Sequence, residues 1–188
     1  MIKKIRSRKG QSLVEALVAL SILMVGLMGI LTLLSRSFFI ERTTSDETKA
    51  TYLASEGIEI AKSFIDHDVY LGLATNNAAG GWGTCFNFTP GTPGAPTSFS
   101  YELDYTTVNC PASPNFAGDP LMFDPATGLY SYAGPYVGTP VKTTFVRTIT
   151  IIKPSPYEID VQSTVTWSSG SITNQSLTLE DHFYDWHP

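Results

Sequence analysis

Only a few residues of this 188-residue chain combine a type and a position that suggest chemistry. Glu15 is the only charged residue between Lys9 and Arg36, in a stretch that is almost entirely apolar. A carboxylate in such a setting costs free energy unless an opposite charge or water compensates it. Cys85 and Cys110 are the only cysteines, and no CxxC motif indicates zinc or redox chemistry.

Other groups of polar residues give weaker indications. The segment HFYDWH begins with His182 and ends with His187, and on a strand these two side chains point to opposite faces, which favours a structural or surface role over a metal site. Asp119, Asp124 and Gly128 lie in a predicted loop whose oxygens could hold calcium, but their spacing matches no EF-hand, and turn formation explains them more simply. No GxSxG motif is present. We therefore predict no enzyme, no metal site and no cofactor.

The N-terminal region predicts a membrane-spanning helix. Residues 16–35 carry no charge, and a helix of that length is roughly 30 Å long, the thickness of a bilayer core. A secretory signal peptide would have a shorter apolar core followed by a small-residue cleavage site. The apolar stretch here is longer than such a core, and no small-residue cleavage site follows Leu34. Five basic residues precede the apolar stretch and predict a cytoplasmic N-terminus, with everything after Arg36 outside: Lys3, Lys4, Arg6, Arg8 and Lys9.

The charge balance of the remaining chain is strongly acidic. After Gly10, seven basic residues face all seventeen acidic ones, a formal charge of −10. Such a body repels phosphate through its average field, although a local basic patch is still compatible with this balance. No nucleic-acid partner is predicted for it.

The pattern of apolar residues predicts that the helix continues beyond the membrane. All twelve prolines lie at or after Pro90, so none interrupts a helix before that point. We predict one helix over residues 12–66, roughly 80 Å long. Its second half carries an apolar stripe at spacings of three and four that should pack on another element: Ala50, Leu53, Ala54, Gly57, Ala61, Phe64 and Ile65.

Strand patterns follow a loop over residues 72–98 that is rich in Gly, Asn, Thr and Pro. In one strand, Ile159, Val161, Val165 and Trp167 share a face with Ser163. The segment SSGS at residues 168–171 predicts a short turn into the last strand. We expect an antiparallel sheet with one face on the amphipathic helix. Its predicted strands cover residues 99–108, 129–133, 141–152, 157–168 and 172–183.

The two cysteines are expected in an oxidising exterior compartment. There a disulfide between Cys85 and Cys110 is the expected state, and closing this loop is worth on the order of 3 to 4 kcal/mol in the chain-entropy model. Two free or differently used thiols are the alternative.

A short basic leader ends at Gly10 and is followed by Gln11, Ser12, Leu13, Val14 and Glu15, and then by the apolar helix. This arrangement resembles the class III signal of type IV pilins and of the related pseudopilins of type II secretion. The resemblance is specific in the first 35 residues and general elsewhere. It implies an α+β, pilin-like fold in which a long N-terminal helix packs on a C-terminal antiparallel β-sheet.

The resemblance also implies how the chain is processed. A membrane prepilin peptidase would cleave after Gly10 and methylate the new amine of Gln11, where the family most often has Phe. The expected organisation is a cleaved leader over residues 1–10, a transmembrane and filament-core helix over 11–35, an amphipathic helix half over 36–66, and an extracytoplasmic β-rich head over 67–188.

By the family mechanism, the Glu15 carboxylate meets the freed N-terminal amine of a neighbouring subunit in the filament. A charge in lipid strongly favours a geometry that supplies an opposite charge. The alternative is that Glu15 lies near the membrane interface, where snorkelling and the positive end of the helix reduce its cost.

The run LVEALVAL resembles the minor subunits termed V in pili and I in secretion pseudopili more than a major pilin. Major pilins also often carry a proline in the membrane half, where this chain has only Gly26 and Gly29. The implied function is a minor pilin of the bacterial inner membrane and then of a surface filament. Its implied partners are the peptidase, other pilin subunits, the lipid bilayer and a membrane assembly platform driven by a cytoplasmic ATPase.

Two alternatives stay open. One is a pseudopilin of a type II secretion or DNA-uptake system. The other is a permanently membrane-anchored extracytoplasmic binding protein whose signal only resembles that of a prepilin.

Overall fold

The structure, a computed structural model, describes residues 9–75, 81–86, 98–111, 114–170 and 172–186. Several sequence predictions fall outside these residues. They are the basic leader up to residue 8, most of the loop over 72–98, Ser171 of the predicted turn, and His187.

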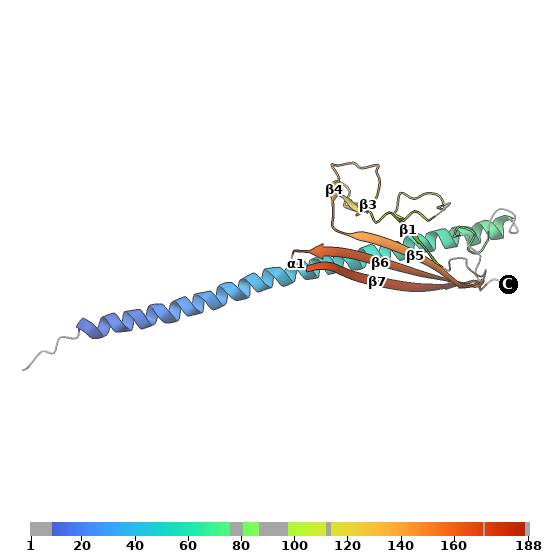
Figure 1. Cartoon of the computed structure of the whole chain (residues 1–188). Coiled ribbons are helices and arrows are strands. Elements are labelled where there is room, and N and C mark those ends of the chain that lie inside the picture. The colour runs from blue at the N-terminus through green and yellow to red at the C-terminus, as the bar shows by residue number, and fades with distance from the viewer. Residues whose placement is uncertain (1–8, 76–80, 87–97, 112–113, 171, 187–188) are drawn as a thin grey trace, which may run out of the picture. The chain divides into compact units, whose positions relative to one another are not determined.

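One helix, α1 (Lys9–Thr75), accounts for the first part of the described chain (Figure 1). It begins three residues before the predicted start and ends nine residues after the predicted end. The extension at its end has a packing reason, because the buried stripe continues through Asp68 and Gly72. The carboxylate of Asp68 also accepts a hydrogen bond from the backbone N–H of Cys85, which holds the last turns against the segment that follows.

The chain divides into two compact units, Met1–Ser45 and Asp46–Pro188. In the second unit, residues 46–75 of α1 lie along an antiparallel sheet with strand order β1-β5-β6-β7, and a smaller antiparallel sheet has the order β3-β2-β4 (Figure 1). The strands are β1 (Ser98–Tyr101), β2 (Met122–Asp124), β3 (Leu129–Ser131), β4 (Val141–Lys142), β5 (Val146–Ser155), β6 (Glu158–Ser169) and β7 (Ile172–Tyr184). The long helix on an antiparallel sheet confirms the predicted α+β, pilin-like arrangement.

The predicted strand over residues 99–108 is too long, because β1 ends at Tyr101. The chain turns there: the Asp104 carboxylate accepts hydrogen bonds from the backbone N–H and the hydroxyl of Thr106, at 2.9 and 2.6 Å, which favours a turn over an extended strand. The Asp104 backbone N–H also donates to the hydroxyl of Thr107 at 3.2 Å.

The predicted strand over residues 141–152 is two strands, β4 and β5. Between them Thr143 donates both its backbone N–H and its hydroxyl to the carbonyl of Leu121, which breaks the regular ladder. Strand β2 was missed because it has only three residues, too few to show a period. Strand β3 begins where predicted and ends two residues earlier. The two C-terminal strands, β6 and β7, match their predictions to within one residue at each end.

The core lies between α1 and the inner face of the main sheet. Every residue of the predicted helix stripe is buried, and Ser163 shares the buried face of β6 as predicted. The buried apolar residues form two clusters. The first cluster includes Leu53 of α1 and Trp167 of β6. The second cluster includes Phe64 of α1 together with four residues of β5 and β6: Ile149, Ile151, Ile159 and Val161.

A layer made of two polar residues and one glycine separates the two clusters. Gly57 lies between their helix residues, Ser163 lies between their β6 residues, and Arg147 precedes Ile149 on β5. A Cβ atom on Gly57 would collide with the Ser163 hydroxyl and lie 3.1 Å from Cδ of Arg147. The helix can therefore approach the sheet here only because residue 57 has no side chain.

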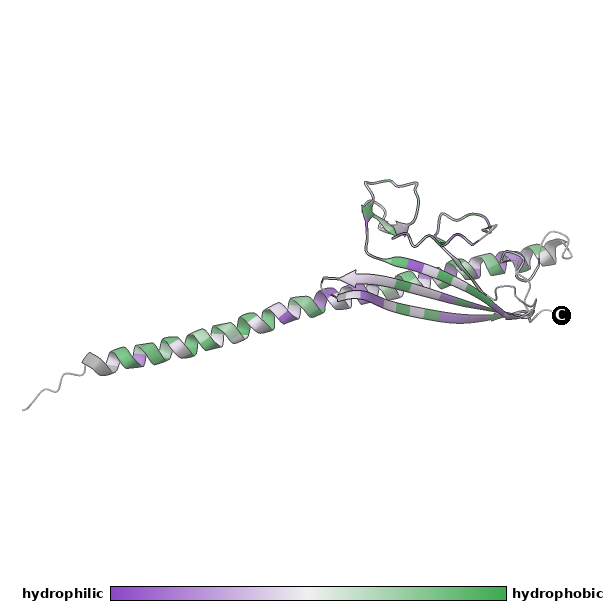
Figure 2. Cartoon of the chain, in the orientation of Figure 1, coloured by the Kyte–Doolittle hydropathy of each residue, from purple (hydrophilic) through white to green (hydrophobic). Residues whose placement is uncertain are grey.

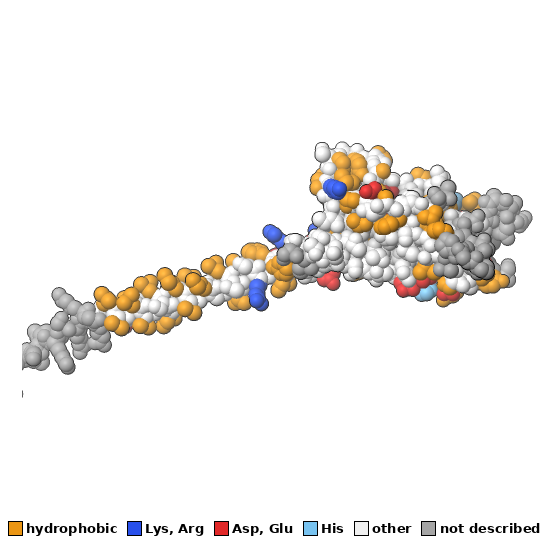
Figure 3. All heavy atoms as spheres, in the orientation of Figure 1, with side chains coloured by type: hydrophobic (Ala, Val, Ile, Leu, Met, Phe, Trp, Pro, Cys, Tyr) orange, Lys and Arg blue, Asp and Glu red, His pale blue; other side chains and the backbone are white. Residues whose placement is uncertain are grey.

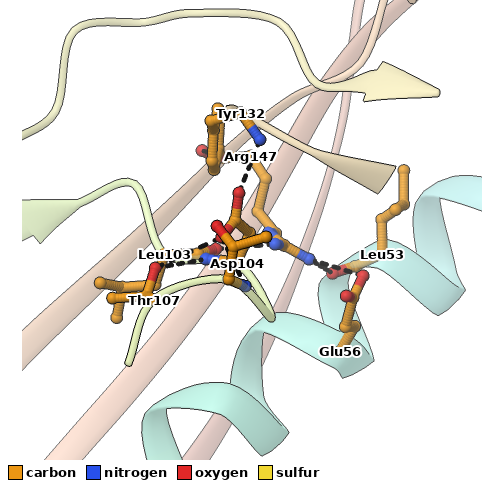
Figure 4. A network of polar contacts seen from close by, with 8 residues as sticks. Leu53, Glu56, Leu103, Asp104, Thr107, Tyr132 and Arg147 are labelled. Atoms are coloured by element: carbon orange, nitrogen blue, oxygen red, sulfur yellow. Dashed lines mark hydrogen bonds and ion pairs between the residues drawn. The ribbon is translucent and has the colours of Figure 1, made fainter. Parts of the chain in front are cut away.

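The Arg147 side chain is fully buried and joins three parts of the second unit (Figure 4). One terminal nitrogen, Nη1, donates to the backbone carbonyl of Leu53 at 3.0 Å and to the Glu56 carboxylate at 2.9 Å, both on α1. The other, Nη2, donates to the carbonyl of Leu103 at 2.7 Å, in the loop after β1. Tyr132 donates its hydroxyl to the Arg147 carbonyl at 2.6 Å, and burial raises the pKa of Tyr132 to about 12.

We expect the substitution Arg147→Met to destabilise the second unit by about 2 to 4 kcal/mol, because it leaves the buried Leu103 carbonyl without its donor and removes the tie to α1. Urea unfolding of the purified chain in detergent micelles, followed by tryptophan fluorescence, measures the loss. The control is Lys142→Met at an exposed position of β4, which should change stability by less than about 0.5 kcal/mol. Equal stability of both variants would contradict the role given to Arg147.

Candidate processing and assembly segment

The predicted processing and assembly residues all lie in the first turns of α1. Gly10 and Gln11 are in the first turn, and Glu15 lies one turn later, four residues after Gln11. Glu15 is exposed. The unpaired N–H groups of a helix belong to its first four residues, and the first turn of α1 holds no acidic residue, so Glu15 lies beyond the groups that would compensate its charge.

The helix surface that follows Glu15 is apolar on all sides. From Leu13 to Leu34 the large apolar side chains are each between 49% and 73% exposed. Figure 2 shows this hydrophobic stretch along the helix, and Figure 3 shows the apolar side chains on its surface. By length and composition this helix can cross a membrane, and none of its most apolar window is buried within the chain.

The few polar side chains of this stretch are satisfied within the helix. Ser21 donates its hydroxyl to the carbonyl of Leu17, and Thr32 donates to the carbonyl of Met28, each at 2.8 Å. A hydroxyl that bonds to its own helix needs no water, so these residues are compatible with an apolar surrounding.

Two glycines leave open space on the same surface. A Cβ atom on Gly26 or Gly29 would have no heavy atom within 4 Å outside the local helix backbone. Small residues at such positions allow another helix to approach closely. The segment therefore offers an apolar helix surface, one carboxylate and two positions without a side chain.

The two cysteines lie in the second unit, away in sequence from this segment. Cys85 and Cys110 form a disulfide, which joins the segment after α1 to the segment after β1. Cys85 is buried in the cluster that includes Phe64. The structure thus agrees with the expected pairing and not with two free thiols.

The predicted loop residue Asp124 has a structural role at the end of β2. Its carboxylate accepts backbone N–H groups of Ala126 at 2.9 Å, Val137 at 2.7 Å and Gly138 at 3.1 Å. Burial opposes its ionisation, but these hydrogen bonds outweigh the burial and lower the pKa of Asp124. The carboxylate therefore organises the loop, as the turn interpretation predicts.

The other two residues of that loop have backbone roles. Gly128 has a φ of +76°, which favours glycine, and its N–H donates to the carbonyl of Asp124 at 2.8 Å. The backbone N–H of Asp119 donates to the Glu102 carboxylate at 2.8 Å.

The sequence prediction missed a cluster around His182. In the structure Asp160 and Glu180 lie beside His182, and their potential ligand atoms are all within 4.8 Å of one another. The missing signal was the strand register: Asp160 is opposite His182 on β6 and β7, which neither strand pattern reveals alone.

Comparison with known proteins gives one match. The prokaryotic N-terminal methylation motif matches residues 5–31, a range that includes Gly10, Gln11 and Glu15. No curated protein and no solved structure matches the chain. The match thus falls on the N-terminal segment of the chain.

We expect no free thiol in the protein recovered from cells. Maleimide labelling under denaturing conditions should modify neither Cys85 nor Cys110 without reductant, and both after reduction. A Cys85→Ala, Cys110→Ala double variant is the control for background labelling. Modification of both residues without reductant would contradict the disulfide.

Proposed function

We propose that the chain is a minor structural subunit of a type IV pilus or a related filament, on the premise that its methylation motif is that of the type IV pilin and pseudopilin family. The observation that carries the proposal is the exposed apolar helix with a single carboxylate one turn after Gly10 and Gln11. The choice of a minor subunit rests on the run LVEALVAL alone.

The apolar helix would serve in two settings in succession. In the inner membrane, lipid covers its side chains, and the basic leader keeps the N-terminus in the cytoplasm. In a filament, helices of neighbouring subunits replace the lipid. Because lipid is as apolar as leucine, close packing decides this exchange, and the open surface at Gly26 and Gly29 favours it.

The charge of Glu15 would favour the assembled filament over separate subunits in the membrane. Cleavage after Gly10 creates a positive amine on Gln11, and a neighbouring subunit presents the same amine to Glu15. A charge pair is worth more in lipid than in water, so subunits in which carboxylate and amine meet are favoured over separate ones. Assembly would also involve the membrane platform and its cytoplasmic ATPase.

The second unit would form the exposed head on the outside of the cell. Its disulfide suits that compartment. A pseudopilin of a secretion or DNA-uptake system has the same segment and stays an alternative. A permanently anchored binding protein is distinguished by retention of the leader, which mass spectrometry of the N-terminus detects.

Replacing Gly10 by leucine should block processing, because the family signal depends on glycine at the cleavage position. The variant should stay in the membrane with its leader attached, and immunoblotting should detect the larger precursor. The matched control is Gly26→Leu, where a side chain meets open space, and which should be processed normally. A Gly10→Leu chain of mature size would contradict the prepilin assignment.

The substitution Glu15→Val should separate processing from assembly. Loss of the charge favours burial in lipid, so insertion and cleavage should survive, while the pairing with a neighbour's amine is lost. The amount of the variant in sheared filaments should therefore fall, with processed protein accumulating in the membrane.

The matched control for this experiment is Glu41→Val, which removes another exposed carboxylate of the same unit. It should enter filaments as the wild type does. Unchanged incorporation of a fully processed Glu15→Val chain would show that the carboxylate is not needed for assembly.

A further inference from the structure

The outer face of β6 and β7 carries several groups that can bind a metal ion. Residues of β6 alternate between the core and this outer face, with Ile159 and Val161 inside. The antiparallel register places Asp160 opposite His182 and Gln162 opposite Glu180. Two carboxylates and one imidazole from two strands therefore meet on the face that points away from α1.

The imidazole of His182 is held between two acids. Its Nδ1 atom lies 3.2 Å from the Glu158 carboxylate, and its Nε2 atom lies 3.4 Å from the Glu180 carboxylate. Tyr184 donates its hydroxyl to the same Glu158 oxygen at 3.1 Å and stacks on the imidazole ring. Glu158 and Tyr184 thus fix the ring so that Nε2 faces Glu180.

Asp160 lies at the base of this group, and one of its two carboxylate oxygens has no partner in the described part of the chain. It is only 6% exposed, and its Oδ1 atom has no hydrogen-bond partner among the residues that the structure describes. A buried carboxylate oxygen without a donor or cation is costly.

We propose that Asp160, Glu180 and the Nε2 atom of His182 bind a divalent transition-metal ion, with zinc as the best fit. Zinc takes nitrogen and carboxylate ligands at about 2.0 to 2.2 Å in tetrahedral geometry, which places ligand atoms about 3.4 Å apart. The distance between Nε2 and the Glu180 oxygen, 3.4 Å, already matches. The exposed side chain of Glu180 can adjust to Asp160, whose position the sheet fixes.

The ligand set also selects the kind of ion. Calcium and magnesium prefer oxygen ligands alone, whereas imidazole suits zinc and its neighbours in the transition series. A hydrogen bond from Nδ1 to a carboxylate is the usual support of a metal-bound histidine, so Glu158 acts as a positioning residue. The other described group of potential ligands, Asp68 with Cys85 and Cys110, has its sulfurs in a disulfide and offers no thiolate.

The ion would connect β7, the edge strand of the main sheet, to β6. Binding to the folded state alone raises stability with the ion concentration, so zinc would stabilise the C-terminal edge of the sheet. This inference does not depend on the proposed function, because it concerns only the second unit.

The test uses the full chain in detergent micelles, purified without a polyhistidine tag and freed of metal by a chelator. Equilibrium dialysis against zinc, with metal analysis of the protein, should find about one ion per chain. His182→Ala and Asp160→Asn should each weaken binding at least tenfold, and Glu158→Gln should weaken it by about 10- to 100-fold. The matched control, His67→Ala on the exposed side of α1, should bind as the wild type does.

A second measurement separates binding at this site from effects on folding. Zinc should raise the thermal unfolding temperature of the wild type and of His67→Ala but not that of Asp160→Asn, whose side chain keeps the size of aspartate. The proposal is overturned if the wild type binds no zinc, if Asp160→Asn and His182→Ala bind it as tightly as the wild type, or if calcium competes with zinc on equal terms.

Discussion

The burial of the Arg147 guanidinium is the constraint on which the arrangement of the second unit depends. A charge with no access to water must find its acceptors inside the protein, and here they come from α1 and from the loop after β1. The position of α1 along β5 is therefore fixed, because the Leu53 carbonyl must lie within hydrogen-bond distance of the Arg147 guanidinium. Gly57 permits the close approach that this contact needs.

Buried or half-buried acids give order to the loops around this centre. Glu102 accepts three successive backbone N–H groups, Asp104 connects its own turn to Tyr132, and Asp124 holds the loop after β3. Each carboxylate accepts backbone N–H groups that would be paired in a β-sheet but have no strand partner in a loop. Hydrogen bonds to a charged acceptor are stronger than those between neutral groups. Part of the acidic excess of the chain is thus structural.

The single helix α1 meets two different surroundings, and its sequence changes accordingly. Up to Leu34 it is apolar on every side and exposed within the chain, as a helix surrounded by lipid or by other helices must be. From Ala50 onward only one stripe is apolar, and that stripe is covered by the sheet. The same backbone structure therefore presents an apolar surface on all sides in its first half and contributes one buried stripe to the core of the second unit in the other.

The sequence alone determined the features that depend on local period and composition. It located the apolar helix with Glu15, the buried stripe from Ala50 to Ile65, the two long C-terminal strands and the single possible cysteine pair. The helix, its stripe and the strands show a regular period along the chain, and the cysteine pair is the only one possible. None of these features requires knowledge of the surface on which the segment packs.

Only the tertiary structure decided which distant residues meet. The burial of Arg147 against α1, the short strands β2 and β4, and the placing of Asp160 beside His182 depend on strand register and on helix height. A shift of one residue in register would move each of these side chains to the opposite face of the sheet. Packing of the whole core sets that register, and no local stretch of sequence contains it.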